Sequence, residues 1–182
     1  MPYGSGSQFD TTIKVWNTTT WRLVYTYTGH MYPIFYAEFL NDTTIASCSI
    51  DQTIQIWRIG GQNAYIRNIT IVPNFVFGPN GPSSSIQSTP TTLKLLPNNL
   101  LASGDLSGVI YIWNLTSSSL FPLVEKVINA HTSIILQFEL VSDELMASAA
   151  DDSTIKIWNI TTSPITLVNT LDVGQPFGVF TS

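Results

Sequence analysis

The chain has 182 residues, enough for one domain with a hydrophobic core, and its 44% hydrophobic and 10% charged residues argue against disorder over most of its length. Its net charge is −5, from 7 Lys+Arg and 12 Asp+Glu. Nucleic acids and anionic membranes are bound by clustered cations, and no basic cluster occurs in the sequence, so neither class of partner is expected.

The sequence contains no segment that would direct or anchor the chain to a membrane. No apolar run approaches the roughly 20 residues that span a bilayer, and residues 1–5 lack the basic and apolar regions of a signal peptide. The single cysteine, Cys48, excludes an internal disulfide and a cysteine-cluster metal site. We therefore expect a cytoplasmic or nuclear protein that uses no cofactor and no metal ion.

Short runs in which Ile or Val alternates with polar residues predict an all-β fold. Taken in chain order, the predicted strands are 3–7, 12–16, 23–28, 34–39, 44–49, 53–57, 64–69, 91–95, 100–104, 109–113, 123–128, 134–140, 145–149, 154–158, 166–171 and 177–180.

Several side chains recur in a fixed register, which indicates an internal repeat. The tryptophans that end four of these strands are Trp16, Trp57, Trp113 and Trp158. An aspartate lies six positions before three of them, at Asp10, Asp51 and Asp152. The two histidines, His30 and His131, each lie 27 positions before a tryptophan.

With these landmarks the sequence resembles the WD-repeat family, which has Gly-His near one end of its repeat and Trp-Asp near the other. Gly29-His30 matches the first landmark, and Ala130-His131 matches it with Gly replaced. Asn follows three of the tryptophans in place of Asp, and we interpret it as a turn-forming substitute. The resemblance implies one β-propeller domain over residues 1–182, built from four repeat units of four-stranded antiparallel blades with strands a to d. A closed four-bladed ring and a part of a larger propeller are both compatible with this sequence.

The resemblance also implies a hydrogen-bonded tetrad inside a blade. The expected tetrads are His30, Ser47, Asp51 and Trp57 in the second blade, and His131, Ser148, Asp152 and Trp158 in the fourth. A Ser-His-Asp catalytic site could be drawn from the same residue types. Because the pattern repeats, whereas an active site occurs once, we interpret these residues as structural and expect no catalytic residue. The third blade has Ser107 at the aspartate position and lacks a histidine, so lower local stability is expected for this blade and for the incomplete first blade.

Partner binding is expected on the face that carries the d–a loops and the b–c turns. The residues just before the turn aspartate positions are Phe9, Ile50, Leu106 and Asp151, and Met31 and Tyr32 join them on the same rim. An insertion between strands d and a, at residues 72–88, adds Phe75 and Phe77 as candidate anchors. Some of these side chains could instead pack inward beneath neighbouring loops.

These features favour a non-catalytic scaffold that binds proteins or peptides through this face. Two alternatives remain open at this point: a piece of a larger regulatory protein to which this segment contributes only blades, and an enzyme built on a propeller. Self-association is expected if the propeller is incomplete, because uncovered blade faces invite it.

Overall fold

The computed structural model describes residues 10–60, 65–70, 77–78, 81–82, 89–116, 123–127 and 129–174. Its strands are β1 (Thr12–Trp16), β2 (Leu23–Thr28), β3 (Ile34–Asn41), β4 (Thr44–Ser49), β5 (Thr53–Arg58), β6 (Tyr65–Thr70), β7 (Phe77–Gly78), β8 (Gly81–Pro82), β9 (Pro90–Leu96), β10 (Leu100–Asp105), β11 (Ile110–Asn114), β12 (Leu123–Val127), β13 (Ile135–Leu140), β14 (Leu145–Ala150), β15 (Thr154–Asn159) and β16 (Thr166–Asp172). One turn of 3₁₀ helix, Pro97–Asn99, is the only helix within these ranges, and no described helix could cross a membrane.

The predicted all-β architecture is confirmed. Blade one is the pair β1-β2, blade two is β3-β4-β5-β6, blade three is β9-β10-β11-β12, and blade four is β13-β14-β15-β16. Every neighbouring pair of strands is antiparallel, and the described strands begin and end within two residues of their predicted bounds. The predicted strands 3–7 and 177–180 lie outside the described residues. Within the insertion at 72–88 only the backbone of the short pair β7-β8, which the sequence did not predict, is described.

A β-bulge precedes the tryptophan of every blade. The pairing of strand c with strand d shifts register between Val15 and Trp16, and in the same way just before Trp57, Trp113 and Trp158. A bulge inserts one extra residue and re-aims the side chain beside it. Its recurrence shows that the four tryptophans occupy equivalent places.

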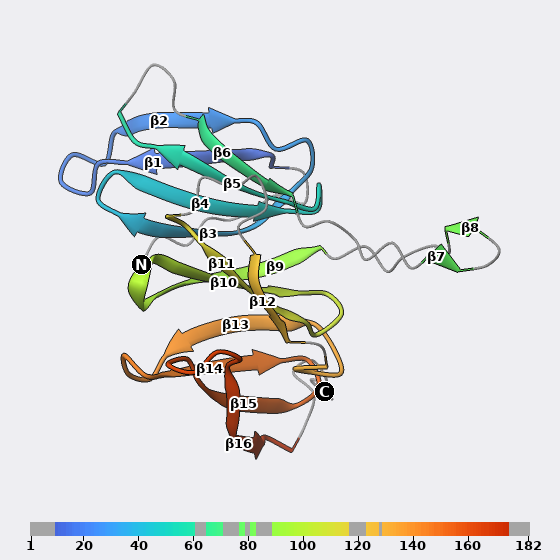
Figure 1. Cartoon of the computed structure of the whole chain (residues 1–182). Coiled ribbons are helices and arrows are strands. Elements are labelled where there is room, and N and C mark those ends of the chain that lie inside the picture. Colours follow the sequence, from blue (N-terminus) through green and yellow to red (C-terminus); the bar gives the residue numbers. More distant parts are fainter. Residues whose placement is uncertain are drawn as a thin grey trace, which may run out of the picture.

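The blades lie in a row, with blade one at one end and blade four at the other (Figure 1). We call the face that a blade turns toward the next blade in the chain its forward face, and the opposite face its rear face. Between blades two and three, Ile54 and Ile56 of the forward face share one apolar cluster with Trp113 of the rear face. The contact between blades three and four repeats this arrangement, with Ile110 and Ile112 in one cluster with Trp158. The contact between blades one and two places Ile13 with Trp57.

These contacts form the core. Ile54 and Ile110 are fully buried, and burial of such a side chain stabilises a fold by about 1.5–3 kcal/mol. The core therefore lies between the blades, and the strands of blades two and three alternate their side chains between two covered faces.

The asparagines after strand c form side-chain turns. The threonine two residues after the asparagine is the donor. Thr116 donates both its N–H and its hydroxyl to Oδ1 of Asn114, and Thr161 donates the same two groups to Oδ1 of Asn159. Oδ1 of Asn17 accepts the backbone N–H groups of Thr19 and Thr20. These contacts are those expected of asparagine as a turn former.

Candidate functional site

The structure brings together the four side chains expected to form a tetrad in blade two. Trp57 Nε1–H donates to Ser47 Oγ over 2.9 Å, and Ser47 Oγ lies 2.8 Å from His30 Nε2. His30 Nδ1 lies 2.8 Å from Asp51 Oδ2. Since the indole can only donate, the serine hydroxyl keeps its hydrogen for His30 Nε2, and Nδ1–H then donates to the carboxylate. The four side chains thus form one chain of hydrogen bonds, in which each residue donates to the next, from tryptophan through serine and histidine to aspartate.

Blade four carries the same arrangement. Trp158 Nε1–H donates to Ser148 Oγ over 2.8 Å, and that oxygen lies 2.6 Å from His131 Nε2. His131 Nδ1 lies 3.0 Å from the nearer oxygen of Asp152. Two networks with matching geometry, one in each of two blades, favour a shared role in holding the blade together.

A serine, a histidine and an aspartate linked in this order also match the geometry of a nucleophilic catalytic triad. The serine oxygens, however, cannot reach a substrate: Ser47 and Ser148 are both 0% exposed, and each oxygen also accepts an indole N–H. The histidine side chains are 0% exposed as well. The arrangement can therefore fix the backbone but cannot deliver a nucleophile to solvent.

Each tetrad aspartate also ties the d–a loop to the b–c turn. Asp51 Oδ2 accepts the backbone N–H of Met31 at 3.1 Å, while Oδ1 accepts the N–H and the hydroxyl of Thr53 at 3.0 and 2.6 Å. Asp152 makes the matching bonds to Thr132 and Thr154. One carboxylate thereby fixes two loops on the same rim.

These bonds determine the ionisation of the tetrads. Burial alone would raise the pKa of Asp152, but the bonds from Thr154, Thr132 and His131 outweigh it and hold the pKa at about 2. The pKa of Asp51 is lowered for the same reason. Burial lowers the pKa of His131, against the opposing effect of Asp152. In blade four these opposite shifts favour a neutral His131 imidazole beside an ionised Asp152.

Blade three replaces the tetrad with a different network, which sequence reasoning missed. Trp113 still donates to Ser103 Oγ at 2.8 Å. Asp105, which is 0% exposed, accepts the N–H groups of Ser107 and Val109, both at 2.9 Å, and the hydroxyl of Tyr111 at 3.3 Å. The signal in the sequence was an aspartate two residues early together with a tyrosine two residues before the tryptophan.

The d–a loops and b–c turns lie at one end of the blades, because strand directions alternate from a to d. We call this end the loop face. On blade two its exposed apolar residues are held by their backbone: Ser49 Oγ donates to the carbonyl oxygen of Tyr32 at 2.8 Å, and Ile50 N–H donates to that of Pro33 at 3.1 Å. Met31 is 81% exposed, Tyr32 56% and Ile50 40%.

The other residues expected to bind partners are distributed along the same rim. Leu106 is 40% exposed, and its N–H donates to the carbonyl oxygen of Thr89 in the same way as Ile50 to Pro33. Asp151 is exposed and occupies this position in blade four. Phe9 and Phe75 lie outside the described residues, and of Phe77 only the backbone is described.

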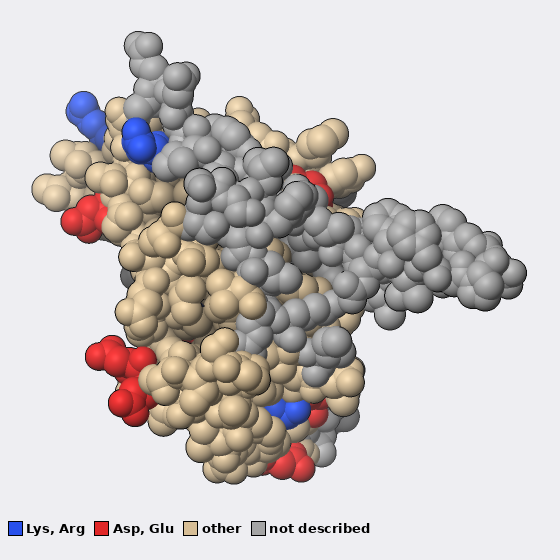
Figure 2. All heavy atoms as spheres, viewed as in Figure 1, with Lys and Arg blue, Asp and Glu red and all other residues tan. Residues whose placement is uncertain are grey.

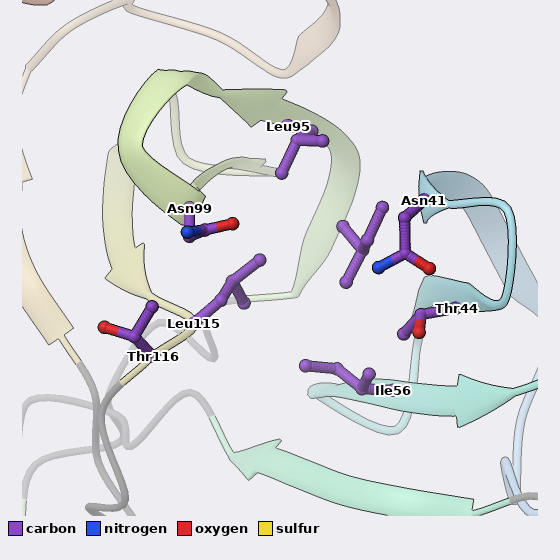
Figure 3. A pocket seen from close by; sticks show the side chains of 8 residues that line it. Asn41, Thr44, Ile56, Leu95, Asn99, Leu115 and Thr116 are labelled. Carbon is purple, nitrogen blue, oxygen red and sulfur yellow. The ribbon is translucent and has the colours of Figure 1, made fainter.

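The opposite end of the blades carries a pocket of about 330 Å³ between blades two and three (Figure 3). Its lining residues are Leu40, Asn41, Thr44, Ile56, Leu95, Asn99, Leu115 and Thr116. Two of its polar atoms already serve turns: Asn41 Oδ1 accepts two bonds from Thr43, and the Asn99 backbone carbonyl accepts the N–H of Leu115. We assign no ligand to it.

The described charges do not form a binding site of their own. Within the described ranges, no three His, Cys, Asp or Glu side chains gather as metal ligands would. In the view of Figure 2, Lys and Arg occupy one corner and a separate spot near the opposite end, with Asp and Glu between and around them. Lys94 lies 3.3 Å from Glu139 and 3.9 Å from Glu38, so the fifth residue of strand a alternates in charge from blade two to blade four.

Comparison with known proteins agrees with this repeat geometry. Residues 21–58 and 124–159 match the family described as WD domain, G-beta repeat. The chain is 30% identical over 116 residues to apoptotic protease-activating factor 1 of Rattus norvegicus, which covers 63% of this chain and 8% of that protein. It is 32% identical over 123 residues to a bromodomain and WD repeat-containing protein of Dictyostelium discoideum, covering 64% of this chain and 5% of that protein.

The fold matches a chain in the crystal structure of a mitotic checkpoint complex, with a TM-score of 0.71 at 20% sequence identity. The match covers 91% of this chain and 47% of the other. The chain thus spans a small part of the two similar proteins and about half of the solved chain.

Proposed function

Because the chain belongs to the WD-repeat family of β-propeller proteins, we propose that it is a non-catalytic scaffold that binds protein or peptide partners through its loop face. WD repeats generally serve as protein-interaction scaffolds. The partner-binding residues in this proposal are Phe9, Met31, Tyr32, Ile50, Phe75, Phe77, Leu106 and Asp151.

The observation that carries the proposal is the exposed apolar corner of blade two. Met31, Tyr32 and Ile50 present large apolar side chains to solvent, although each is attached to a backbone fixed by Asp51, Ser49 or Pro33. Because the backbone beneath these side chains is already held, binding costs little further backbone entropy, and exposed apolar and aromatic groups are typical interface anchors. The scarcity of cations on the chain supports an apolar or mixed peptide surface over a phosphorylated one.

A binding experiment with a triple variant tests this surface. Partners captured by the wild-type chain are measured again with Met31→Asp, Ile50→Asp and Leu106→Asp combined. Each position is exposed, so the fold should be retained, and we expect at least a tenfold loss of affinity. The control is Val141→Asp, which alters a 58% exposed apolar residue in the a–b turn at the opposite end of blade four.

If the triple variant bound every partner as tightly as the wild type, while the control variant did so too, the loop face would not be the binding surface. Circular dichroism of all three proteins establishes that any loss reflects the surface and not unfolding.

A second candidate is that the segment belongs to a larger regulatory protein and contributes only blades. The two similar proteins favour it, since the matched region covers 8% and 5% of their lengths. Replacement of the loop-face residues would then leave binding unchanged, whereas deletion of a blade would abolish it.

The proposed location of the protein is the cytoplasm or the nucleus. Burial raises the pKa of the Cys48 thiol, which supports an inert, reduced cysteine in that location.

A further inference from the structure

The three contacts between neighbouring blades are built from the same residue types on the forward and rear faces. In each contact, isoleucine from the forward face of one blade shares an apolar cluster with tryptophan from the rear face of the next. The tryptophans on the covered rear faces, Trp57, Trp113 and Trp158, are only 3 to 4% exposed. A covered blade contact in this protein therefore has a recognisable signature on each side.

The forward face of blade four has the isoleucine half of this signature without its cover. Ile155 and Ile157 pair with Ala149 and Ala147 in the register that places Ile54 and Ile56 beside Cys48 and Ala46 in blade two. The blade-two residues are buried, whereas all four in blade four are partly exposed. Leu171, which pairs with Ile155, is 47% exposed.

The rear face of blade one has the tryptophan half. Trp16 follows the same bulge as the other three tryptophans but is 52% exposed. Its cross-strand partner Leu23 is 46% exposed. The two uncovered faces are thus the two sides of the contact that the chain makes three times internally.

These faces lie at opposite ends of the row of blades, so one copy cannot bring them together while it keeps its three internal contacts (Figure 1). We propose that two copies of this chain associate head to tail, with the forward face of blade four of each copy covering the rear face of blade one of the other. Ile155, Ile157 and Leu171 of one copy then pack against Trp16 and Leu23 of the second.

Two features of the chain support a second copy as the occupant. The contact continues the existing stacking of blades, so no new type of packing is needed. The chain also spans 47% of the length of the solved propeller chain that it matches, so two such arcs supply a comparable length. Used twice around a two-fold axis, the contact leaves neither end uncovered, which is the condition for a closed assembly.

Sedimentation equilibrium of the 182-residue chain at micromolar concentration measures the association. We expect twice the 20.1 kDa mass of one chain. Trp16→Glu and Leu171→Glu should each give a monomer, because each removes one side of both contacts. An equimolar mixture of the two variants should recover a heterodimer, since one contact then has both sides intact. Val141→Glu, which changes an exposed residue away from both faces, should remain a dimer.

The mixing experiment distinguishes this arrangement from others. A face of blade four that paired with itself would make Leu171→Glu monomeric and leave Trp16→Glu dimeric, which would overturn the proposal. A wild-type monomer at every concentration would overturn it too, as would open polymers of increasing mass.

Cross-linking gives a second readout that does not depend on the charged variants folding. Cys48 is fully buried and does not compete for a thiol reagent. A chain with Trp16→Cys mixed with one carrying Leu171→Cys should yield a mixed cross-linked dimer with a short bis-maleimide. If only cross-links between identical variants formed, the head-to-tail contact would be wrong.

Discussion

The backbone N–H of His131 donates to the carbonyl oxygen of Gly108 over 2.9 Å, which ties the b–c turn of blade three to the loop that carries the tetrad histidine of blade four. Gly108 has a φ of +78°, and a Cβ built there would lie 2.2 Å from the carbonyl oxygen of His131. The turn and the loop therefore approach each other as closely as a glycine allows.

Replacement of this glycine should separate the cost of backbone strain from that of crowding. Gly108→Ala should lower the free energy of unfolding by about 2–4 kcal/mol, because it adds a steric overlap to the roughly 1 kcal/mol cost of positive φ. Gly174→Ala is the matched control: its φ is +75°, but nothing lies within 4 Å of its Cβ position, so only the backbone cost applies. Urea unfolding measures both, and equal losses would contradict the proposed close contact.

Removal of one indole donor should weaken a tetrad without emptying the core. Trp57→Phe keeps an aromatic ring but removes the N–H bond to Ser47, and we expect a loss of about 1–2 kcal/mol from the bond and the reduced packing. Trp16→Phe, at a 52% exposed indole, should cost under about 0.5 kcal/mol in the monomeric Leu171→Glu background. Thermal unfolding compares the two; similar losses would show that the tetrad bond contributes little.

Stability should fall with decreasing pH in two steps. The folded pKa of His131 is below its ordinary value of 6.5, so below about pH 6.5 the unfolded chain binds a proton first and stability decreases. The folded pKa of Asp152 is about 2 against 3.8, so a further loss of up to about 2 kcal/mol follows between about pH 4 and pH 2. Urea titrations from pH 7.5 to pH 2.5 measure both steps.

His131→Gln provides the control for the first of these steps. Glutamine keeps polar contacts but has no titrating group, so the decrease near pH 6.5 should shrink while the acidic step remains. A variant with an unchanged profile near pH 6.5 would assign that step to another group.

Blade three should be more protected than blade four in hydrogen exchange. It lacks a tetrad, which from the sequence alone predicted lower local stability, but both of its faces are covered and Asp105 has three donors. The amides of Ala102 and Ile112 should exchange more slowly than their equivalents Ala147 and Ile157, which are partly exposed. Faster exchange in blade three would restore the prediction made from sequence.

The sequence predicted the order of the strands because alternation and the position of tryptophan report local requirements. A strand that places Ile54 and Ile56 on one face must alternate, and a bulge before Trp57 recurs at a fixed spacing. The residues of the two tetrads were expected from the resemblance to the WD-repeat family, and the structure places them within hydrogen-bond distance.

Other features depend on contacts between distant parts of the chain. The bond from Tyr111 to Asp105 depends on which way the tyrosine points after folding, and residue type alone does not determine that direction. The exposure of Ile155 and Trp16 depends on which blades have neighbours, although their sequence patterns match those of buried equivalents. Repeat patterns therefore predict what a side chain is suited to contact, while the structure shows whether that contact is made.

The bonds that hold the rim of blade two attach to main-chain atoms: the N–H of Met31, the carbonyl oxygen of Tyr32 and the N–H of Ile50. These bonds do not depend on which side chains project from those three positions. New residues can therefore be introduced there, by evolution or by engineering, without rebuilding the blade beneath them.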